Sequence, residues 1–471
     1  MSHRPNFTQE VTQNRLDAAV AAGLAVGADA VEAVFRGHDS HMMRLGDGRV
    51  TQAQSILEGR VIVRALCHGA EAYASTTDLT STGLAAAAQA AVERAAVLPA
   101  PKEPGELPPP NAAGIQSAAT RAAWDEATAA LDDATKRTWL TPALSAHEKD
   151  GLALAGRFHT GSRFMGVRSS RGVSAWHAGT YCDLALSTLE RPAGHRASSF
   201  RARFDRAAQP DTLNAMAEAT RAECHLAHDP MDVDPGKWDV VLAPTAVADL
   251  LEWFGMIGFS SEAFDDSRSF VEGRIGERVT GDAVTLWDDG QMGHGLGVPL
   301  PIDAEGQPRQ RTLLIDHGVA RGSVWDHRSG RRHGCASTGH AAGVDLFSTG
   351  GSMTQHLSFE PGTAQLDELI GRLDRGLFIT RFHYVNGMIE PRRAVMTGLL
   401  RDAAFLVEGG RIQRAVRPMR FTDAILEAFG RIAGPQAVGA VLEPHGGLSA
   451  DGRCTVCPAV HIPGFAFTSG R

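Results

Sequence analysis

The first hundred residues alternate between two spacings of hydrophobic positions. Apolar side chains three and four residues apart are typical of a helix with one buried face, and strict alternation is typical of a strand. By this criterion helices are predicted at residues 7–27 and 80–97, and strands at residues 30–36, 42–55 and 58–66, with a Gly46-Asp-Gly48 turn dividing the second of these. We therefore expect residues 1–97 to form an N-terminal α+β domain.

A proline-rich segment interrupts this pattern at residues 98–110. Six of its thirteen residues are proline, which lacks the backbone N–H that helix interiors and central strands need. We interpret residues 98–117 as a linker, either a semi-rigid spacer or a strap on the surface.

Residues 118–233 again mix the two spacings. Helices are predicted near residues 120–137 and 211–228, and strands near residues 152–170 and 172–187. This segment is expected to be a central α+β domain.

The C-terminal half, residues 234–471, begins with a buried strand at 238–244 and a helix at 245–256. From residue 274 onward, short strands are separated by Gly- and Asp-containing turns, with one helical segment at 363–375. Short strands at regular spacing favour a barrel-like or layered β-rich domain. The predicted fold class is α+β overall.

The composition narrows the class of protein. Hydrophobic residues make up 43% of the chain and charged residues 21%, which is typical of a soluble globular protein. The net charge of −8 argues against direct binding of nucleic acid, and no apolar run is long enough to predict a membrane-spanning helix. Six scattered cysteines and a polar N-terminus without a signal peptide favour the cytoplasm.

Two groups of residues resemble metal ligands. Cys454 and Cys457 form a C-x-x-C pair with His461 nearby, and His383 lies in a strand-like segment; thiolates and imidazoles are ligands that zinc prefers. A single C-x-x-C in an apolar segment is more often part of a buried strand, and we favour that interpretation. Four histidines between residues 317 and 340 lie among arginines, which favours a solvated turn.

Several segments, in their order and spacing, resemble the TldD/PmbA family, whose older name is modulator of DNA gyrase. The C-terminal segments are Arg274-Ile-Gly-Glu-Arg-Val279, Trp287-Asp-Asp-Gly290, Ile302-Asp-Ala-Glu-Gly306-Gln-Pro308, Thr312-Leu-Leu-Ile-Asp-His-Gly318, Ser337-Thr-Gly339 and residues 366–370, 376–380 and 405–412. Residues 61–65 and 72–76 continue the likeness near the N-terminus. The resemblance covers nearly the whole chain.

The resemblance implies three domains and proteolysis of peptides and unfolded segments. The active member of the family is a zinc peptidase with an H-E-x-x-x-H motif on the helix after the strand that opens the third domain. In that motif two imidazoles hold zinc and the glutamate activates water. The other member, PmbA or TldE, lacks the motif and pairs with the active one.

In this chain Glu252, Trp253 and Ile257 occupy the motif positions, and no histidine lies between His228 and His294. Tryptophan and isoleucine cannot hold zinc, so the chain resembles the PmbA-like member. On the same helix, Phe254, Met256 and Phe259 offer an apolar face. They could contact substrate or a partner, although an apolar helical stripe more often packs in the core, and we favour core packing.

The leading hypothesis is therefore a non-catalytic subunit of a two-component zinc metallopeptidase. A TldD-like partner would supply the zinc in a heterodimer or higher oligomer, with a peptide as the substrate and no metal in this chain. One alternative is an autonomous metallopeptidase whose site is assembled from His383, Cys454, Cys457 and His461. Another is a non-enzymatic binding or scaffold module.

Overall fold

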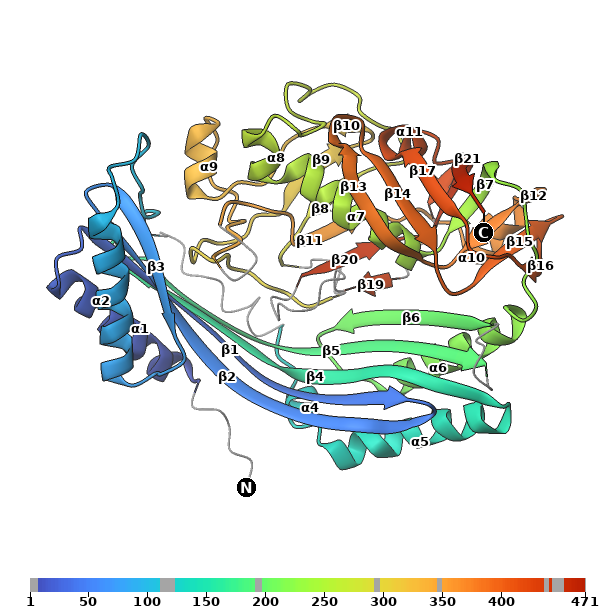
Figure 1. The fold of residues 1–471 in the computed structure, drawn as a ribbon, viewed down its shortest axis with the longest axis horizontal. Helices are drawn as coiled ribbons and strands as arrows, with labels where there is room; N and C mark the ends of the chain where they lie inside the picture. Colours follow the sequence, from blue (N-terminus) through green and yellow to red (C-terminus); the bar gives the residue numbers. More distant parts are fainter. Residues whose placement is uncertain are drawn as a thin grey trace.

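The computed structural model describes residues 7–110, 123–190, 197–291, 297–344, 350–435, 440–442 and 453–470. Within these ranges the chain forms three β-sheets. In Figure 1 the first of them is the long curved sheet at the bottom, and the other two lie in the C-terminal region above it. The mixed α+β class predicted from the sequence is confirmed.

The first sheet is antiparallel and has the strand order β3-β2-β1-β4-β5-β6. Its strands are β1 (Ala30–Gly46), β2 (Arg49–Cys67), β3 (Ala70–Thr76), β4 (Leu152–Ser169), β5 (Ser174–Glu190) and β6 (Ser198–Asp205). Because β1 pairs with β4 from Glu32 to Leu45, strands on both sides of the proline-rich segment belong to one sheet. The proposed domain boundaries stay a prediction.

Helices cover the two ends of this sheet. They are α1 (Gln9–Ala25), α2 (Ser81–Val97), α4 (Glu126–Ala129), α5 (Asp133–Lys149) and α6 (Pro210–Leu226). The helix predicted at residues 120–137 is divided in the described part of this range: α4 lies within it, and α5 begins only at Asp133. Asp132 is the N-cap residue of α5. Its side chain accepts a hydrogen bond from the Thr135 backbone N–H at 2.8 Å, so the helix begins at Asp133.

The C-terminal region holds the other two sheets. The second sheet has the order β10-β9-β8-β11-β20-β19, and the third runs β13-β14-β17-β21-β7-β12-β15-β16, with β18 beside β21. A β-rich C-terminal region is thus confirmed. Its described strands form open sheets and do not close into a barrel, since no pairing joins the two ends of either strand order.

The bounds of these strands and helices are as follows. The strands are β7 (Gly236–Leu242), β8 (Leu286–Asp288), β9 (Thr312–Asp316), β10 (Val319–Ala320), β11 (His356–Phe359), β12 (Arg375–Ile379), β13 (Phe382–Glu390), β14 (Val395–Leu400), β15 (Ala404–Glu408), β16 (Arg411–Ala415), β17 (Arg420–Ala424), β18 (Gly434–Pro435), β19 (Ala440–Leu442), β20 (Cys454–Cys457) and β21 (Val460–Ser469). The helices are α7 (Pro244–Phe259), α8 (Ser261–Asp265), α9 (His327–Arg332), α10 (Leu366–Gly371), α11 (Ile425–Gly430) and the 3-10 turn η1 (Pro391–Arg393).

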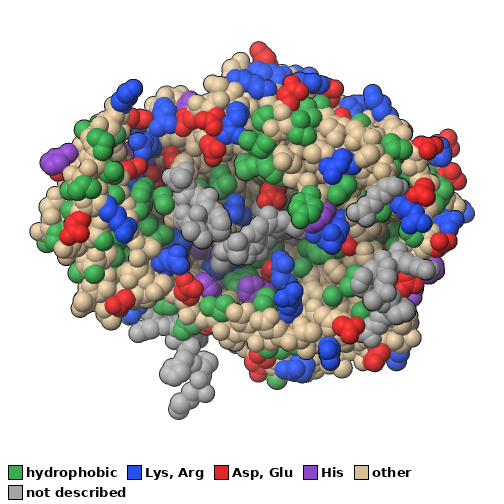
Figure 2. Space-filling model, in the orientation of Figure 1, with side chains coloured by type: hydrophobic (Ala, Val, Ile, Leu, Met, Phe, Trp, Pro, Cys, Tyr) green, Lys and Arg blue, Asp and Glu red, His purple; other side chains and the backbone are tan. Residues whose placement is uncertain are grey.

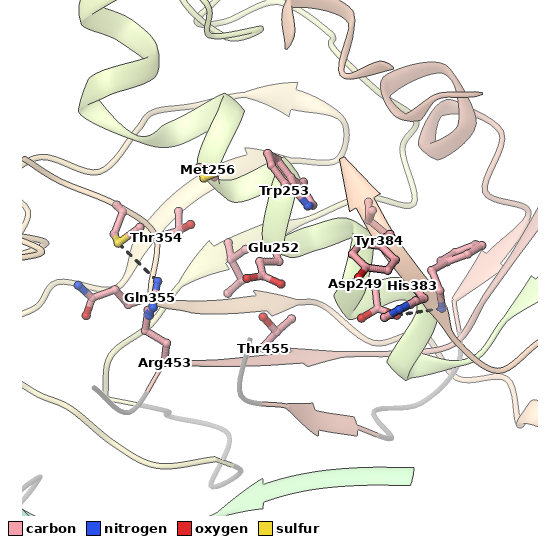
Figure 3. A pocket seen from close by; sticks show the side chains of 14 residues that line it. Asp249, Glu252, Trp253, Met256, Thr354, Gln355, His383, Tyr384, Arg453 and Thr455 are labelled. Carbon is pink, nitrogen blue, oxygen red and sulfur yellow. Dashed lines mark hydrogen bonds between the residues drawn. The ribbon is translucent and has the colours of Figure 1, made fainter. Parts of the chain in front are cut away.

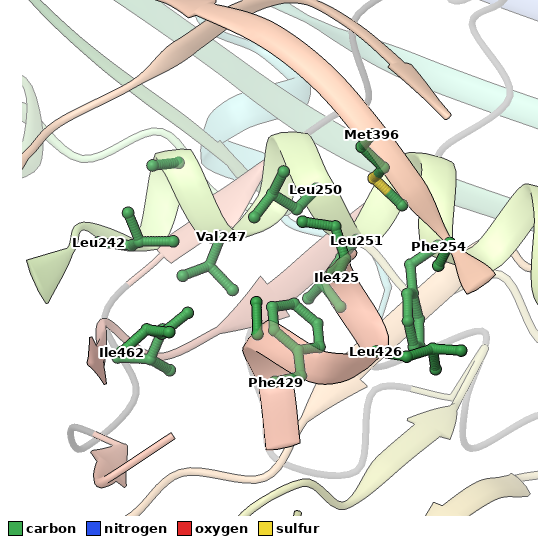
Figure 4. Close-up of a cluster of buried hydrophobic side chains, with 14 of the residues drawn as sticks. Leu242, Val247, Leu250, Leu251, Phe254, Met396, Ile425, Leu426, Phe429 and Ile462 are labelled. Carbon is green, nitrogen blue, oxygen red and sulfur yellow. The ribbon is translucent and has the colours of Figure 1, made fainter. Parts of the chain in front are cut away.

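Helix α7 is the central element of the C-terminal core (Figure 4). Pro244 occupies its first turn, where the missing N–H costs nothing and the fixed φ favours the helix. Leu250, Leu251 and Phe254 are fully buried and lie in one cluster with Phe429 of α11. Burying each such side chain contributes about 1.5–3 kcal/mol, which fixes the position of the helix.

The proline-rich segment lies between the first sheet and α9. Leu107 is buried beside Leu66, and Gly105 donates a backbone hydrogen bond to Gly69 at 2.8 Å. Glu103 pairs with Arg332 of α9 at 2.9 Å. Residues 98–110 therefore connect the edge of the first sheet to the C-terminal region; residues 111–117 of the predicted linker lie outside the described residues.

None of the described helices is both long and apolar enough to cross a membrane. No disulfide joins any of the six cysteines, all of which lie within the described residues.

Candidate functional site

A cavity of about 580 Å³ lies beside helix α7 in the C-terminal region (Figure 3). Its walls are α7, the start of β13, the strand β20 and the residues just before β11. The lining residues are Asp249, Glu252, Trp253, Met256, Met353, Thr354, Gln355, Leu357, Phe382, His383, Tyr384, Val385, Arg453 and Thr455.

Helix α7 contributes four residues to this cavity, Asp249, Glu252, Trp253 and Met256. They are spaced three, four and seven positions apart, so they lie on one face of the helix. The opposite face is the buried one described above. Two carboxylates at this spacing in an otherwise apolar helix were the sequence signal for the cavity, and the search for a zinc motif missed it.

The carboxyl group of Asp249 has an unusually high pKa. Its pKa is raised to about 7: burial is the largest cause and Glu252 adds to it, while Arg381 and a hydrogen bond from the Phe382 backbone lower the pKa. The Phe382 N–H donates to Oδ2 of Asp249 at 3.0 Å. Near neutral pH this carboxyl group therefore exchanges between its charged and neutral forms inside the cavity.

The opposite wall is an irregular part of β13. The register with β14 shifts between His383 and Asn386, and Tyr384 adopts a left-handed φ of 51°. That conformation costs about 1–2 kcal/mol for a residue with a Cβ atom. Tyr384 is 78% exposed, and its ring centroid lies 4.3 Å from that of His383. The bulge thus presents both aromatic rings at the cavity.

His383 is half-buried, and burial lowers its pKa, with Arg401 and Arg381 lowering it further. A neutral imidazole therefore faces the cavity at neutral pH. Trp253 lies against the same strand, because Gly387 has no side chain: a Cβ there would lie 3.1 Å from the indole ring.

The remaining wall comes from β20 and the residues before β11. Thr455 of β20 pairs in register with Leu357 of β11, and both line the cavity. Gly255 lets the segment just before β11 lie directly on α7. A Cβ atom on Gly255 would overlap the hydroxyl group of Thr354 in that segment. The walls are held by backbone pairing and close packing.

A buried network supports Gln355, one of the lining residues. Arg309 donates to the side-chain oxygen of Gln355 at 2.6 Å and to Asp288 at 2.9 Å. Asp288 also accepts hydrogen bonds from the backbone of Gln355 and from His340, at 2.7 and 2.9 Å. His340 is fully buried, so the predicted solvated turn is wrong for it. His340 and its charged neighbours form a buried hydrogen-bonded network rather than a surface loop.

The degenerate motif positions are divided between two environments. Glu252 and Trp253 face the cavity, whereas Ile257 is 2% exposed and packs in the core. Indole and alkyl side chains offer no metal ligand, so the residues at these positions do not fit zinc. Across the described ranges, no group of three or more His, Cys, Asp or Glu side chains is placed to hold a metal ion.

The other metal candidates are not gathered into one site. Cys454 packs with Tyr181 between the first sheet and the C-terminal region, while the Cys457 thiol donates to the Pro244 carbonyl at 3.2 Å. Residues three apart on a strand point to opposite faces, which separates the two sulfur atoms. His461 lies on β21, and of the four candidates only His383 lines the cavity beside α7.

The three apolar residues of α7 also differ. Phe254 and Phe259 are fully buried, with Phe270 between them in the core, so neither presents a contact surface on this chain. Met256 is 37% exposed and lines the cavity. The core interpretation therefore applies to the two phenylalanines and not to the methionine.

Comparison with known proteins gives consistent matches. Residues 235–469 match the family model described as PmbA/TldA metallopeptidase C-terminal domain, and residues 31–95 match PmbA/TldA metallopeptidase domain 1. A metalloprotease TldD homolog of Haemophilus influenzae is 27% identical over 165 residues, which is 35% of this chain and 33% of that protein. An uncharacterized protein of Methanocaldococcus jannaschii is 37% identical over 106 residues, 22% of this chain and 25% of that protein. The chain thus matches only a quarter to a third of the length of these curated relatives.

Solved structures share the whole fold. TldE from Thermococcus kodakarensis superposes with a TM-score of 0.84 at 18% identity, covering 97% of this chain and 100% of that chain. A candidate modulator of DNA gyrase from Thermotoga maritima gives a TM-score of 0.78 at 19% identity, with coverage of 97% and 100%. At these identities the likeness establishes the fold alone.

Proposed function

Because the chain belongs to the PmbA/TldD metallopeptidase family, we propose that it is the non-catalytic subunit of a two-component zinc metallopeptidase. In this proposal a TldD-like chain supplies the zinc and the water-activating glutamate. The chain described here binds part of an extended peptide or an unfolded segment and helps to enclose it. The assembly is a heterodimer or a higher oligomer in the cytoplasm, where free thiols persist.

One observation carries the proposal. The face of α7 that borders the cavity bears Asp249, Glu252, Trp253 and Met256, and it has no imidazole. The resemblance puts the family's zinc motif on this helix, and here the face of the helix at the cavity carries two carboxylates, an indole and a thioether. This set of groups suits the binding of a ligand better than the hydrolysis of a peptide bond by a metal.

The cavity has the properties expected of a peptide site. Trp253 and Tyr384 offer flat apolar surfaces for side chains, and Thr455 and Gln355 offer hydrogen bonds for a peptide backbone. Asp249 binds a cationic group when ionised and donates a hydrogen bond when neutral. These side chains bind and orient a peptide; no chemical step is assigned to them.

The proposal is tested by comparing the purified chain with the same chain mixed with a TldD-like partner. We expect the chain alone to hold no stoichiometric zinc and to show no chelator-sensitive cleavage of an unfolded peptide. Cleavage should appear in the mixture and co-elute with the complex. One zinc per chain together with chelator-sensitive cleavage by the chain alone would contradict the proposal, and an isolated complex that cleaves nothing would favour a scaffold.

A further inference from the structure

The loop at residues 302–308 connects the C-terminal region to the first sheet by direct packing. Ile302 is fully buried, in one cluster with Val34 of β1 and with Val173 just before β5. Gly306 has a φ of 72°, and a Cβ atom on it would lie 2.8 Å from a methyl group of Val173. Only glycine allows so close an approach in this conformation. We call this contact between the loop and the first sheet the junction.

Ionisable side chains occupy the part of the junction next to α9. They surround a small cavity of about 90 Å³, and Figure 2 shows acidic and basic side chains gathered around α9, at the upper left. The carboxylates are Glu32 on β1, Glu71 on β3, Asp303 and Glu305 on the loop, and Asp326 at the start of α9, and the arginines are Arg36 on β1, Arg64 on β2 and Arg328 on α9. Tyr73 of β3 and His327 of α9 are the other titratable groups of this set. Carboxylates therefore outnumber arginines in a largely buried place.

Two of the arginines converge on one carboxylate. The Nε and Nη2 atoms of Arg64 lie 3.0 and 2.6 Å from Oε2 of Glu71, and Nη1 of Arg328 lies 2.6 Å from the other oxygen of Glu71. The remaining Nη1 atom of Arg64 lies 3.9 Å from Glu32 and 3.6 Å from Glu305, which is longer than a hydrogen bond. Glu32 and Glu305 are therefore neighbours at one guanidinium group, and neither makes a close ion pair with it.

Glu32 is the carboxylate of the first sheet in this pair. It lies directly opposite Arg64 in the register of β1 and β2, and it is 4% exposed. Its Oε2 atom has no hydrogen-bond partner among the described residues. An ionised carboxylate is costly in such a place, so the neutral form is favoured. The pKa of Glu32 is raised to about 7: burial is the largest cause, and Asp303 and Glu71 add to it, while Arg64 lowers the pKa.

Glu305 is the corresponding carboxylate of the loop. It is 8% exposed, and its Oε2 atom accepts a hydrogen bond from the His327 backbone N–H at 3.0 Å. Burial is the largest cause of a pKa well above the usual range, and the neighbouring carboxylates add to it, while Arg64 lowers the pKa. Both members of the pair therefore resist ionisation while the junction is closed.

Two other titratable groups of the junction carry no charge at neutral pH. Burial lowers the pKa of the His327 imidazole; Asp326 opposes this effect and Arg64 adds to it. Burial raises the pKa of the Tyr73 phenol, although Arg64 lowers it. Neither group is therefore a cation that could balance the carboxylates.

The three remaining groups of the set are Arg36, Asp303 and Asp326. Arg36 donates to a backbone carbonyl of the C-terminal region at 3.1 Å. Asp326 caps α9 and accepts hydrogen bonds from the backbone and the side chain of Ser329, at 2.6 and 2.5 Å. Burial raises the pKa of Asp303, although backbone hydrogen bonds and Arg309 lower it. Five carboxylates thus face three arginines, and the closed junction is favoured when some of the carboxylates hold protons.

We propose that Glu32 and Glu305 form a pH-sensitive latch between the first sheet and the C-terminal region. While the two side chains hold protons, the junction is closed. When both are ionised, two like charges face each other across the junction beside one guanidinium group, and the loop at residues 302–308 moves away from the sheet. This inference concerns a regulatory contact and does not rest on the proposed function, which involves the cavity beside α7.

The test measures hydrogen exchange of the full chain by mass spectrometry at about pH 6 and about pH 8.5, on either side of the pKa of Glu32. Each rate is divided by the intrinsic rate at the same pH, which leaves the protection of the segment. The protection of the loop, and of the start of α9 where the His327 N–H bonds to Glu305, should fall about tenfold at the higher pH. One carboxyl group with a pKa of about 7 in the closed state and about 4.3 in the open state gives this factor. The protection of β7 and β21 should not change.

Substitutions then locate the response. Glutamine keeps the size of these side chains and cannot ionise, so Glu32→Gln combined with Glu305→Gln should leave less than about a twofold change. Glu58→Gln is the matched control, because it removes a half-exposed carboxylate of β2 outside this set and should keep the full change. The comparison of the wild type at two pH values needs no variant, so it remains decisive if a substituted chain fails to fold.

Three outcomes would overturn the latch. Equal protection of the loop at both pH values would show that the junction does not respond to these carboxylates. A loss of the same size in β7 and β21 would show global unfolding in place of a local opening. An unchanged response in the double variant would assign the pH dependence to other groups.

Discussion

Two aspartates of the C-terminal region, Asp288 and Asp249, show how similar residues serve different ends. Asp288 is fully buried and accepts four hydrogen bonds, from Arg309, His340 and the backbone of Gln355 and His356. Burial alone would raise its pKa, but His340 and Arg309 hold that pKa well below its usual range. Asp249 accepts one backbone hydrogen bond and borders a cavity, and its pKa is raised to about 7.

The difference separates structural from functional groups. A buried charge with all its partners in place is part of the fold, whatever chemistry its residue types suggest. A carboxylate with a raised pKa at a cavity is available to a ligand. The Asp288 network supports Gln355, and the Asp249 face of α7 carries the groups to which we assign ligand binding. Three predictions test this contrast.

The largest effect is expected from Arg309→Ala. It leaves the carboxylate of Asp288 without its guanidinium partner in a fully buried site, which should lower the free energy of unfolding by about 3–5 kcal/mol. Denaturant unfolding measures this. Arg311→Ala removes an exposed arginine two residues away and should cost less than about 1 kcal/mol. Similar losses for both variants would show that the network is not a structural unit.

Asp249→Asn should change the dependence of stability on pH. The folded-state pKa of Asp249 lies above its unfolded value of about 3.9, so the folded state binds more protons between these two values. Stability from this group is therefore present at low pH and is lost as the pH rises from about 4 to about 7. Over that range we expect the wild type to lose more than about 1 kcal/mol relative to Asp249→Asn. Parallel curves for the two proteins would mean that Asp249 titrates normally.

The smallest effect on stability is expected from Met256→Ala. Met256 is partly exposed at the cavity, so its loss should cost less than about 1 kcal/mol of unfolding free energy while weakening the binding of an unfolded peptide. Phe254→Ala, two residues away on the buried face of the same helix, should cost about 3–5 kcal/mol. Unchanged peptide affinity in Met256→Ala would remove this residue from the site.

The sequence predicted much of the fold but shortened its longest strands. The predicted strand at residues 30–36 continues to Gly46 as β1, and two predicted strands merge into β2. Gly37 directly follows the first predicted strand, Gly59 lies near the start of the strand predicted at 58–66, and the two glycines pair with each other across the hairpin. The rings of Phe35 and Phe7 fill the space that side chains at these glycines would occupy. Long-range packing of this kind leaves no periodic signal.

The site was only partly readable from the sequence. The degenerate motif positions Glu252 and Trp253 lie at the cavity beside α7, and the buried interpretation of the C-x-x-C pair agrees with where Cys454 and Cys457 lie. The spacing of Asp249 and Glu252 was visible in the sequence, but their partners come from β13 and β20, more than a hundred residues away. Only the sheet topology brings these segments together, and no local pattern encodes it.

The most direct test of the proposed division of labour inactivates one subunit at a time in the reconstituted two-chain complex. Glutamine in place of the glutamate of the partner's zinc motif should abolish cleavage of an unfolded peptide. Asp249→Asn combined with Glu252→Gln in this chain should raise KM and largely preserve kcat. Residual chelator-sensitive cleavage with the inactivated partner, abolished by the double substitution in this chain, would contradict the account.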